Sequence, residues 1–177
     1  MRYFYLIFFI LIIFFCTGFA EKITSYRSGV DGLESVFKTH MPLKQGILYT
    51  KVPRGLILSI DENVFFNLGE AAIKESSLYI LDVIAAILQE LPNYCVIESH
   101  TQEDIPQESL YREKWELSTA RAQNIAQYMT VCGKINKERL FPIGFAEYMP
   151  FKGNVFNNSK GFDSRVDFVI IEYEVRR

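Results

Sequence analysis

The sequence predicts an α+β fold, a two-layer α/β sandwich in which two main helices pack on one face of a small mixed sheet. The chain has 177 residues, of which 49% are hydrophobic, and this suits one folded domain. Strand-like and helix-like segments follow in the order strand, helix, strand, helix, strand, strand. Covering one face of the sheet with both helices is the economical way to bury their apolar stripes.

The first half of the domain supplies one strand and one helix. RGLILSI, residues 54–60, is rich in strand formers and is followed by a turn signal, DEN, at 61–63. Residues 64–66 form a second short apolar piece. From 70 to 91 apolar residues recur at steps of three and four, which indicates an amphipathic helix. The Pro-Asn pair at 92–93 ends it.

The second half supplies the other helix and three more strands. Residues 94–98 are predicted to be a strand, 115–131 a helix, and 139–145 and 165–173 two further strands. Trp115 is expected to anchor the first helical turn on the core, with stacking on a sugar as the alternative.

The N-terminus has the pattern of an export signal. Residues 3–16 carry no charge and are shorter than the ~20 residues that cross a bilayer core. Gly18 and Ala20 are the small residues of a cleavage site, so residues 1–20 are predicted to be a signal peptide. An uncleaved anchor and acylation of Cys16 are the alternatives.

The mature chain is divided into an N-terminal extension or spacer over residues 21–53 and a folded domain over residues 54–175. In an oxidising compartment Cys95 and Cys132 could form a disulfide, because the second helix returns toward the start of the strand that holds Cys95. The alternative is two small buried side chains.

Several classes of function are disfavoured. The formal net charge of -2 argues against nucleic-acid binding. The two histidines, His40 and His100, lie in no recognisable nucleophile motif, and the acids within 98–108 are more typical of a solvated loop than of a catalytic pair. His100 with Glu103 or Asp104 lacks a diagnostic metal-binding spacing. We therefore predict no enzyme activity, no metal and no cofactor.

A binding site is favoured instead. Arg121 is predicted to lie early in the second helix, close to the loop that follows the strand ending at Thr101. A guanidinium there can hold a carboxylate in a bidentate fashion, and open amides at a helix start attract anions. Acids on the loop would take an ammonium group, so an amino-acid-like ligand fits. The alternative is a weak surface pair of Arg121 with Glu113, Glu116 or Asp104.

Five segments, taken in order, resemble the peptidoglycan-binding domain of the OmpA/MotB family. They are RGLILSI with VFFNLGEAAI, PNYCVIESHT, WELSTARAQNIAQYM, RLFPIGFAEYMP and SRVDFVI. The resemblance covers about residues 54–173, and the form WELSTAR is closer to the motor-protein branch.

This resemblance implies non-covalent capture of the peptidoglycan stem peptide through its diamino acid. The helix arginine of the family corresponds to Arg121, and Thr101 and Leu117 occupy neighbouring motif positions. Arg165 corresponds to an arginine before the last strand.

The acid that the family places after His-Thr is missing, because Gln102 stands in its position. A glutamine offers only a neutral carbonyl to an ammonium group. Asp104 or Glu103 is the candidate substitute. A pocket for a different diamino acid and a loss of ligand binding are the alternatives.

The leading hypothesis is an exported module of the periplasm or cell envelope that binds peptidoglycan and tethers itself or a partner. The alternative is a scaffold that has lost its ligand and docks on envelope or flagellar-motor proteins. An ion-conducting motor subunit is rejected, because residues 3–20 contain no carboxylate. Membrane contact is expected only if the N-terminal segment is retained, and a homodimer is left open.

Overall fold

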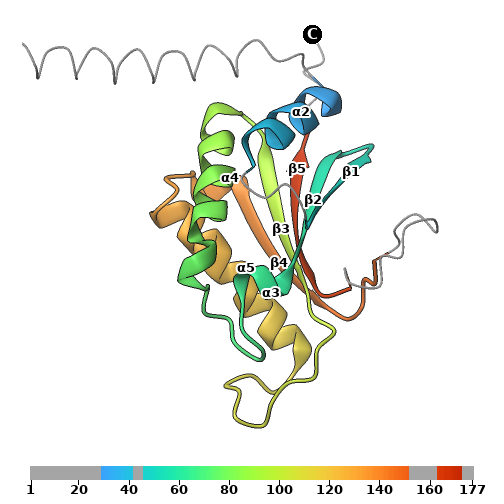
Figure 1. Cartoon of the computed structure of the whole chain (residues 1–177), viewed down its shortest axis with the longest axis vertical. Helices are drawn as coiled ribbons and strands as arrows, with labels where there is room; N and C mark the ends of the chain where they lie inside the picture. The colour runs from blue at the N-terminus through green and yellow to red at the C-terminus, as the bar shows by residue number, and fades with distance from the viewer. Residues whose placement is uncertain (1–28, 42–45, 152–162, 173–177) are drawn as a thin grey trace, which may run out of the picture.

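The computed structural model describes residues 29–41, 46–151 and 163–172, which form a five-stranded sheet with helices on one face (Figure 1). The strands are β1 (Ile47–Val52), β2 (Gly55–Asp61), β3 (Tyr94–His100), β4 (Leu140–Ala146) and β5 (Arg165–Ile171). The longer helices are α2 (Val30–His40), α4 (Leu78–Glu90) and α5 (Lys114–Val131). Shorter elements are α3 (Glu62–Phe65) and the 3-10 turns η1 (Glu75–Ser77) and η2 (Lys137–Arg139).

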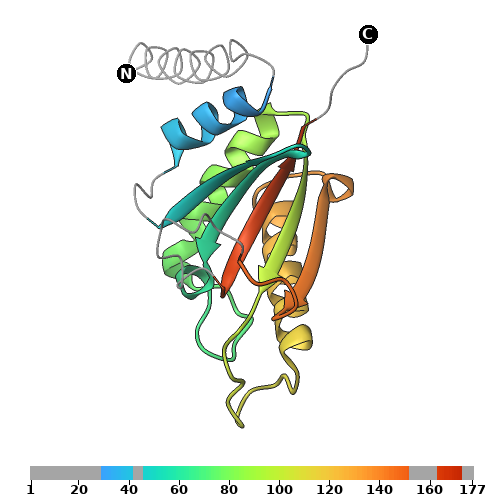
Figure 2. The ribbon, with the colours of Figure 1, turned by 90° about the vertical axis from the view of Figure 1, so that its right-hand side faces the viewer.

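The strand order is β1-β2-β5-β3-β4, so the last strand in sequence lies at the centre of the sheet. β3 and β4 are parallel, and every other pair is antiparallel. Figure 2 shows the open face of this sheet, with α4 and α5 behind it. The predicted α+β class, with helices on one face of a mixed sheet, is confirmed.

The core lies between the sheet and the helices. Alternate residues of β2 and β5 point into it, and Leu58 pairs directly with Phe168 in the register of these strands. α4 and α5 contribute Ile84 and Ile125, which have no solvent exposure. Burying one such side chain contributes about 1.5–3 kcal/mol. A shift of one residue in strand pairing would turn the core side chains of that strand to the other face of the sheet, so their burial determines the register.

The predicted spacer over residues 21–53 needs correction. Within it, α2 buries Val36 and Phe37 in the core, and β1 pairs along its whole length with β2. Lys51 of β1 also binds α2 through Glu34, at 2.9 Å between Nζ and Oε2. Residues 29–41 and 46–52 therefore pack with the folded domain, while the predicted signal at 1–20 lies outside the described residues.

The segment between β2 and α4 contains more structure than the sequence indicated. The short apolar piece at 64–66 lies mostly in α3, whose start is capped by Asp61 accepting a bond from the Asn63 amide at 2.8 Å. The helix expected from residue 70 begins later, at η1 and α4, because the chain first turns back so that the Lys74 amide bonds Phe65 O at 2.8 Å. None of the helices in the described part of the chain has both the length and the hydropathy of a membrane span.

Candidate functional site

Arg121, in the second turn of α5, forms two short ion pairs beneath the end of β3. Its Nη1 lies 2.6 Å from Oε2 of Glu62, and its Nη2 lies 2.6 Å from Oε1 of Glu103. The side chains of Arg121, Glu62 and Glu103 are 1%, 2% and 14% exposed. The guanidinium is therefore held between one deeply buried carboxylate and one that reaches solvent.

The remaining guanidinium donors are also occupied. Nε donates to the carbonyl of Glu70 at 2.9 Å, Nη2 to the carbonyl of Asn67 at 2.9 Å, and Nη1 to Oγ1 of Thr101 at 3.3 Å. The guanidinium also lies over the ring of Phe66, 5.0 Å from its centroid. All five N–H groups of Arg121 thus have an acceptor within the described residues.

The tight turn at Gly69 makes this enclosure possible. Its φ is +68°, and a Cβ there would lie 2.7 Å from the ring of Pro106. The Gly69 amide donates to Oε1 of Glu103 at 3.3 Å. Glycine allows both the left-handed backbone and the close approach of the loop that carries Glu103.

Glu62 is the partner that sequence reasoning missed. Its Oε2 accepts bonds from Arg121 and from the hydroxyl of Thr101, the latter at 3.0 Å. Burial raises the pKa of the Glu62 carboxyl; Arg121 opposes this shift and Glu103 adds to it. The DEN turn signal concealed the role of this residue, although an acid directly after a buried strand was an available clue.

A capping box occupies two of the backbone amides at the start of α5. The Glu113 side chain accepts a bond from the backbone of Glu116, and the Glu113 amide donates to Oε2 of Glu116 at 3.3 Å. The amides of Glu113 and Glu116 are therefore not among the open amides expected at this helix start. The expected surface pairing of Arg121 with Glu113, Glu116 or Asp104 is wrong, because its carboxylate partners are Glu62 and Glu103.

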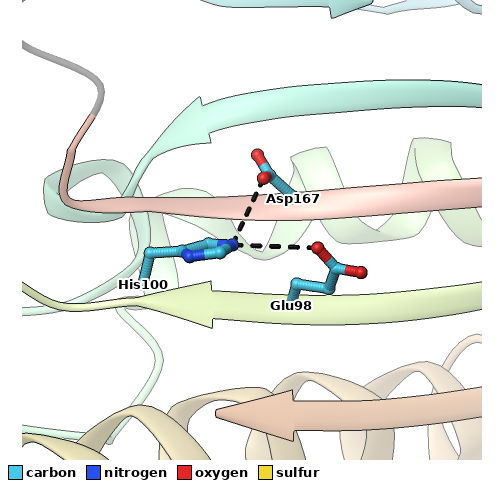
Figure 3. Close-up of side chains that lie close together, drawn as sticks. All are labelled: Glu98, His100 and Asp167. Carbon is cyan, nitrogen blue, oxygen red and sulfur yellow. Dashed lines mark ion pairs between the residues drawn. The ribbon is translucent and has the colours of Figure 1, made fainter. Parts of the chain in front are cut away.

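A second polar cluster lies on the open face of the sheet (Figure 3). Nε2 of His100 is 3.3 Å from Oδ2 of Asp167 and 3.8 Å from Oε2 of Glu98. The three residues offer ligand atoms within 4.8 Å of one another. His100 therefore faces these two acids, and not Glu103 or Asp104, the grouping that the sequence analysis considered and disfavoured.

Arginines already balance the charge of this cluster. Arg165 Nε donates to Oδ2 of Asp167 at 2.9 Å, and its Nη2 lies 3.4 Å from His100 Nε2, on the atoms that would hold a metal. Arg54 donates to Oε1 of Glu98 at 3.1 Å. The arrangement fits a buried network of matched charges better than a metal site.

The pKa values within the cluster follow these contacts. Burial lowers the pKa of His100, but its bonds to Asp167 and Glu98 outweigh this effect, so the pKa is raised. Burial raises the pKa of Asp167, but its bond to His100 and the charge of Arg165 outweigh it, so that pKa is lowered. Both shifts favour the charged forms.

Comparison with known proteins decides the family. The sequence profile of the OmpA family matches residues 65–163, more than half of the chain. The chain belongs to the OmpA family. In Bacillus subtilis (strain 168), Uncharacterized protein YtxE is 34% identical over 128 residues, which is 72% of this chain and 53% of that protein. Motility protein B of the same organism is 25% identical over 118 residues, 66% of this chain and 45% of that protein.

This OmpA-family chain therefore spans about half the length of the curated relatives it matches. Its fold is also found in a solved structure, the cell wall anchor of the T6SS from Pseudomonas aeruginosa. That similarity has a TM-score of 0.66 at 19% identity, and it covers 80% of this chain and 97% of that chain. At this level of identity the likeness concerns the fold alone.

The two candidate substitutes for the acid missing at Gln102 have different surroundings in this OmpA-family domain. Glu103 binds Arg121, whereas Asp104 is fully exposed and has Lys114 Nζ at 3.9 Å from its Oδ1. The backbone amide of Gln102 donates to Oγ of Ser164 at 3.0 Å. Its side-chain Nε2 donates to the carbonyl of Glu147 at 3.4 Å, so it points toward the turn after β4.

The other residues suggested by the resemblance do not share one site. Thr101 joins the cluster of Arg121, but Leu117 is fully buried and serves packing. Arg165 lies with Asp167 on the open face of the sheet, whereas Arg121 lies with Glu62 and Glu103.

Two further expectations from the sequence change. Trp115 is 55% exposed, so it does not anchor α5 on the core. Cys95 is buried, Cys132 is exposed, and both are free thiols, so the suggested disulfide is not formed. Burial raises the pKa of the Cys95 thiol.

Proposed function

We propose that this domain binds the peptide stem of peptidoglycan without a covalent bond and tethers its protein, or a bound partner, to the cell wall. Membership of the OmpA family and the fold shared with a cell wall anchor support this proposal. The observation that carries it is the Arg121–Glu103 ion pair at the end of β3. It sets a cation and an anion side by side, as an amino-acid-like ligand requires.

The ligand carboxylate enters by exchange. Since every N–H of Arg121 is occupied, an incoming carboxylate has to replace one acceptor. Glu62 is almost completely buried, whereas Glu103 is partly exposed. Displacing Glu103 from Nη2 therefore costs less desolvation than displacing Glu62. The new bond is again charge-assisted.

The displaced Glu103 then receives the ammonium group of the ligand. Hydrogen bonds between charged groups are about twice as strong as neutral ones, so a carboxylate at 103 is a better ammonium acceptor than the amide of Gln102. Asp104 lies next to Lys114 and away from Arg121, which makes it the weaker substitute. Glu103 thus takes the part that the family resemblance assigns to position 102.

Co-sedimentation with purified sacculi tests this function. The full chain in detergent should pellet with sacculi, and Glu103→Gln should lower the affinity about tenfold by removing the charged ammonium acceptor. The amide oxygen of Gln can still accept from Arg121, so the fold should persist. Glu108→Gln makes the same change at an exposed position of the same loop and should leave pelleting unchanged. Tighter binding of Glu103→Gln would show that Glu103 only competes with the ligand.

A second candidate is a scaffold that keeps the fold without a ligand and docks on envelope or flagellar-motor proteins. The saturation of Arg121 by internal acceptors favours it. In that case the wild type and Glu103→Gln would both stay in the supernatant over a range of salt concentrations.

Either role is one of binding and not of catalysis, and we place it in the periplasm or elsewhere in the cell envelope. Fractionation of cells, followed by protease treatment of intact and permeabilised envelopes, tests this location. Recovery of the protein in the cytosolic fraction would contradict it. Intact-mass analysis of the recovered protein would show whether residues 1–20 are cleaved, retained or acylated.

A further inference from the structure

A cavity of about 310 Å³ opens beside the peptide site, between the first turn of α5, the turn after β4 and the loop after β3. It is lined by Asp104, Ile105, residues 112–115 and residues 146–148. None of the groups that hold Arg121 lines it. Its volume is at the lower end of the range for small-ligand sites, roughly 300–1,000 Å³.

Close packing fixes the walls of this cavity. A Cβ on Gly144 would lie 2.4 Å from the Thr119 amide nitrogen, so β4 approaches α5 as only glycine permits. The Ala146 amide then donates to Oγ of Ser118 at 3.1 Å, and its carbonyl accepts from the Thr101 amide at 3.0 Å. The turn after β4 is therefore attached both to α5 and to the end of β3.

Two exposed aromatic side chains line the cavity. Trp115 is 55% exposed and Tyr148 is 76% exposed, and they come from different walls. Trp115 is the one tryptophan in the chain. Aromatic rings left in solvent beside a cavity are typical of a surface that contacts a ligand.

The charges around the cavity nearly cancel. Three acids and two bases line it, and Lys114 bridges two of the acids, with Nζ 2.6 Å from Glu147 and 3.9 Å from Asp104. A simple anion would meet the carboxylates, and a simple cation would meet Lys114. A neutral ligand with many hydroxyl groups could use donors and acceptors together.

We propose that this cavity is a saccharide subsite that holds a sugar ring of the peptidoglycan glycan strand. Trp115 packs against the face of the ring, while Lys114 and Glu147 bond its hydroxyl groups. The proposal rests on the proposed wall-binding function but uses a separate site. The bond from Gln102 to the Glu147 carbonyl connects the loop of Glu103 to this cavity, so peptide and sugar would bind side by side.

The fluorescence of Trp115 reports on this site directly. Glycan strands stripped of peptide should shift the emission of the full chain in detergent to shorter wavelength in a saturable way. Calorimetry with the same strands should show about five- to tenfold weaker binding for Trp115→Ala, and nearly unchanged binding for Trp115→Phe. Tyr79→Ala removes an exposed aromatic on α4 and serves as the matched control. Circular dichroism establishes that each variant is folded.

The outcomes separate the two proposals. If sacculi pellet the wild type and Trp115→Ala equally and peptide-free glycan leaves the emission unchanged, the subsite is wrong and the wall-binding function stands. If free stem peptide shifts the emission and glycan does not, the cavity belongs to the peptide and the inference is again overturned. If glycan shifts the emission and binds Trp115→Ala more weakly, but Glu103→Gln pellets as the wild type does, the subsite stands and the proposed peptide site fails.

Discussion

The guanidinium of Arg121 and the carboxylate of Glu62 lie 2.6 Å apart and are almost completely removed from solvent. This pair joins α5 to the start of α3, at the end of the sheet where the proposed ligand binds. Arg121 is therefore a structural residue as well as the proposed ligand-binding residue. A substitution that removes the Arg121 side chain would therefore change both the stability of the fold and ligand binding, and would not separate the two roles.

Arg121→Met should destabilise the domain by about 3–5 kcal/mol, because it leaves the buried charge of Glu62 without a partner. Adding Glu62→Leu should recover most of this loss, since apolar side chains often replace a buried ion pair at little cost. Urea unfolding of the two variants and the wild type measures both effects. A loss below about 1 kcal/mol for Arg121→Met would contradict the structural role.

Gln102→Asp should strengthen binding of a soluble stem peptide about five- to tenfold, because it adds a second charged acceptor for the ammonium group. Calorimetry measures the change. Gln107→Asp introduces the same charge at an exposed position of the same loop and should have little effect. Equal affinities for Gln102→Asp and the wild type would argue that Glu103 already compensates fully. If the wild type shows no measurable binding and Gln102→Asp does bind, the result would favour the scaffold role.

The cluster on the open face should make stability depend on pH through His100. Its pKa is raised above 6.5, so the protonated ring stabilises the fold fully below about pH 6.5, and this contribution is lost as pH rises through the folded-state value. The groups around it are Glu98, Asp167, Arg165 and the stacked ring of Phe145. Urea unfolding should show a larger deficit for His100→Gln at about pH 6 than at about pH 9. An equal deficit at both values would contradict the charged state.

The two described cysteines should differ in reactivity. In a Cys16→Ser variant, a maleimide should label Cys132 in the native protein, whereas Cys95 should react only after denaturation because it is buried. Mass spectrometry under non-reducing conditions should find no bond between them. Labelling of neither thiol before reduction would contradict the free-thiol arrangement.

Hydrophobic periodicity predicted much of the fold, because it reflects local burial. The expected helix at 115–131 agrees closely with α5, and the strands at 139–145 and 165–173 agree with β4 and β5. The periodicity did not reveal α2 and β1, whose burial depends on partners far along the chain. The same limit applies to Glu62, whose role comes from a residue on α5.

By itself, the sequence determined the class of fold, the OmpA-family resemblance and the place of Arg121 near the loop after β3, because these follow from local pattern and ordered motifs. Only the tertiary structure decided which acids meet that arginine, which face carries Arg165, and that Trp115 stands beside a cavity. Such contacts join residues distant in the chain, and their strength depends on burial and geometry that no local pattern contains.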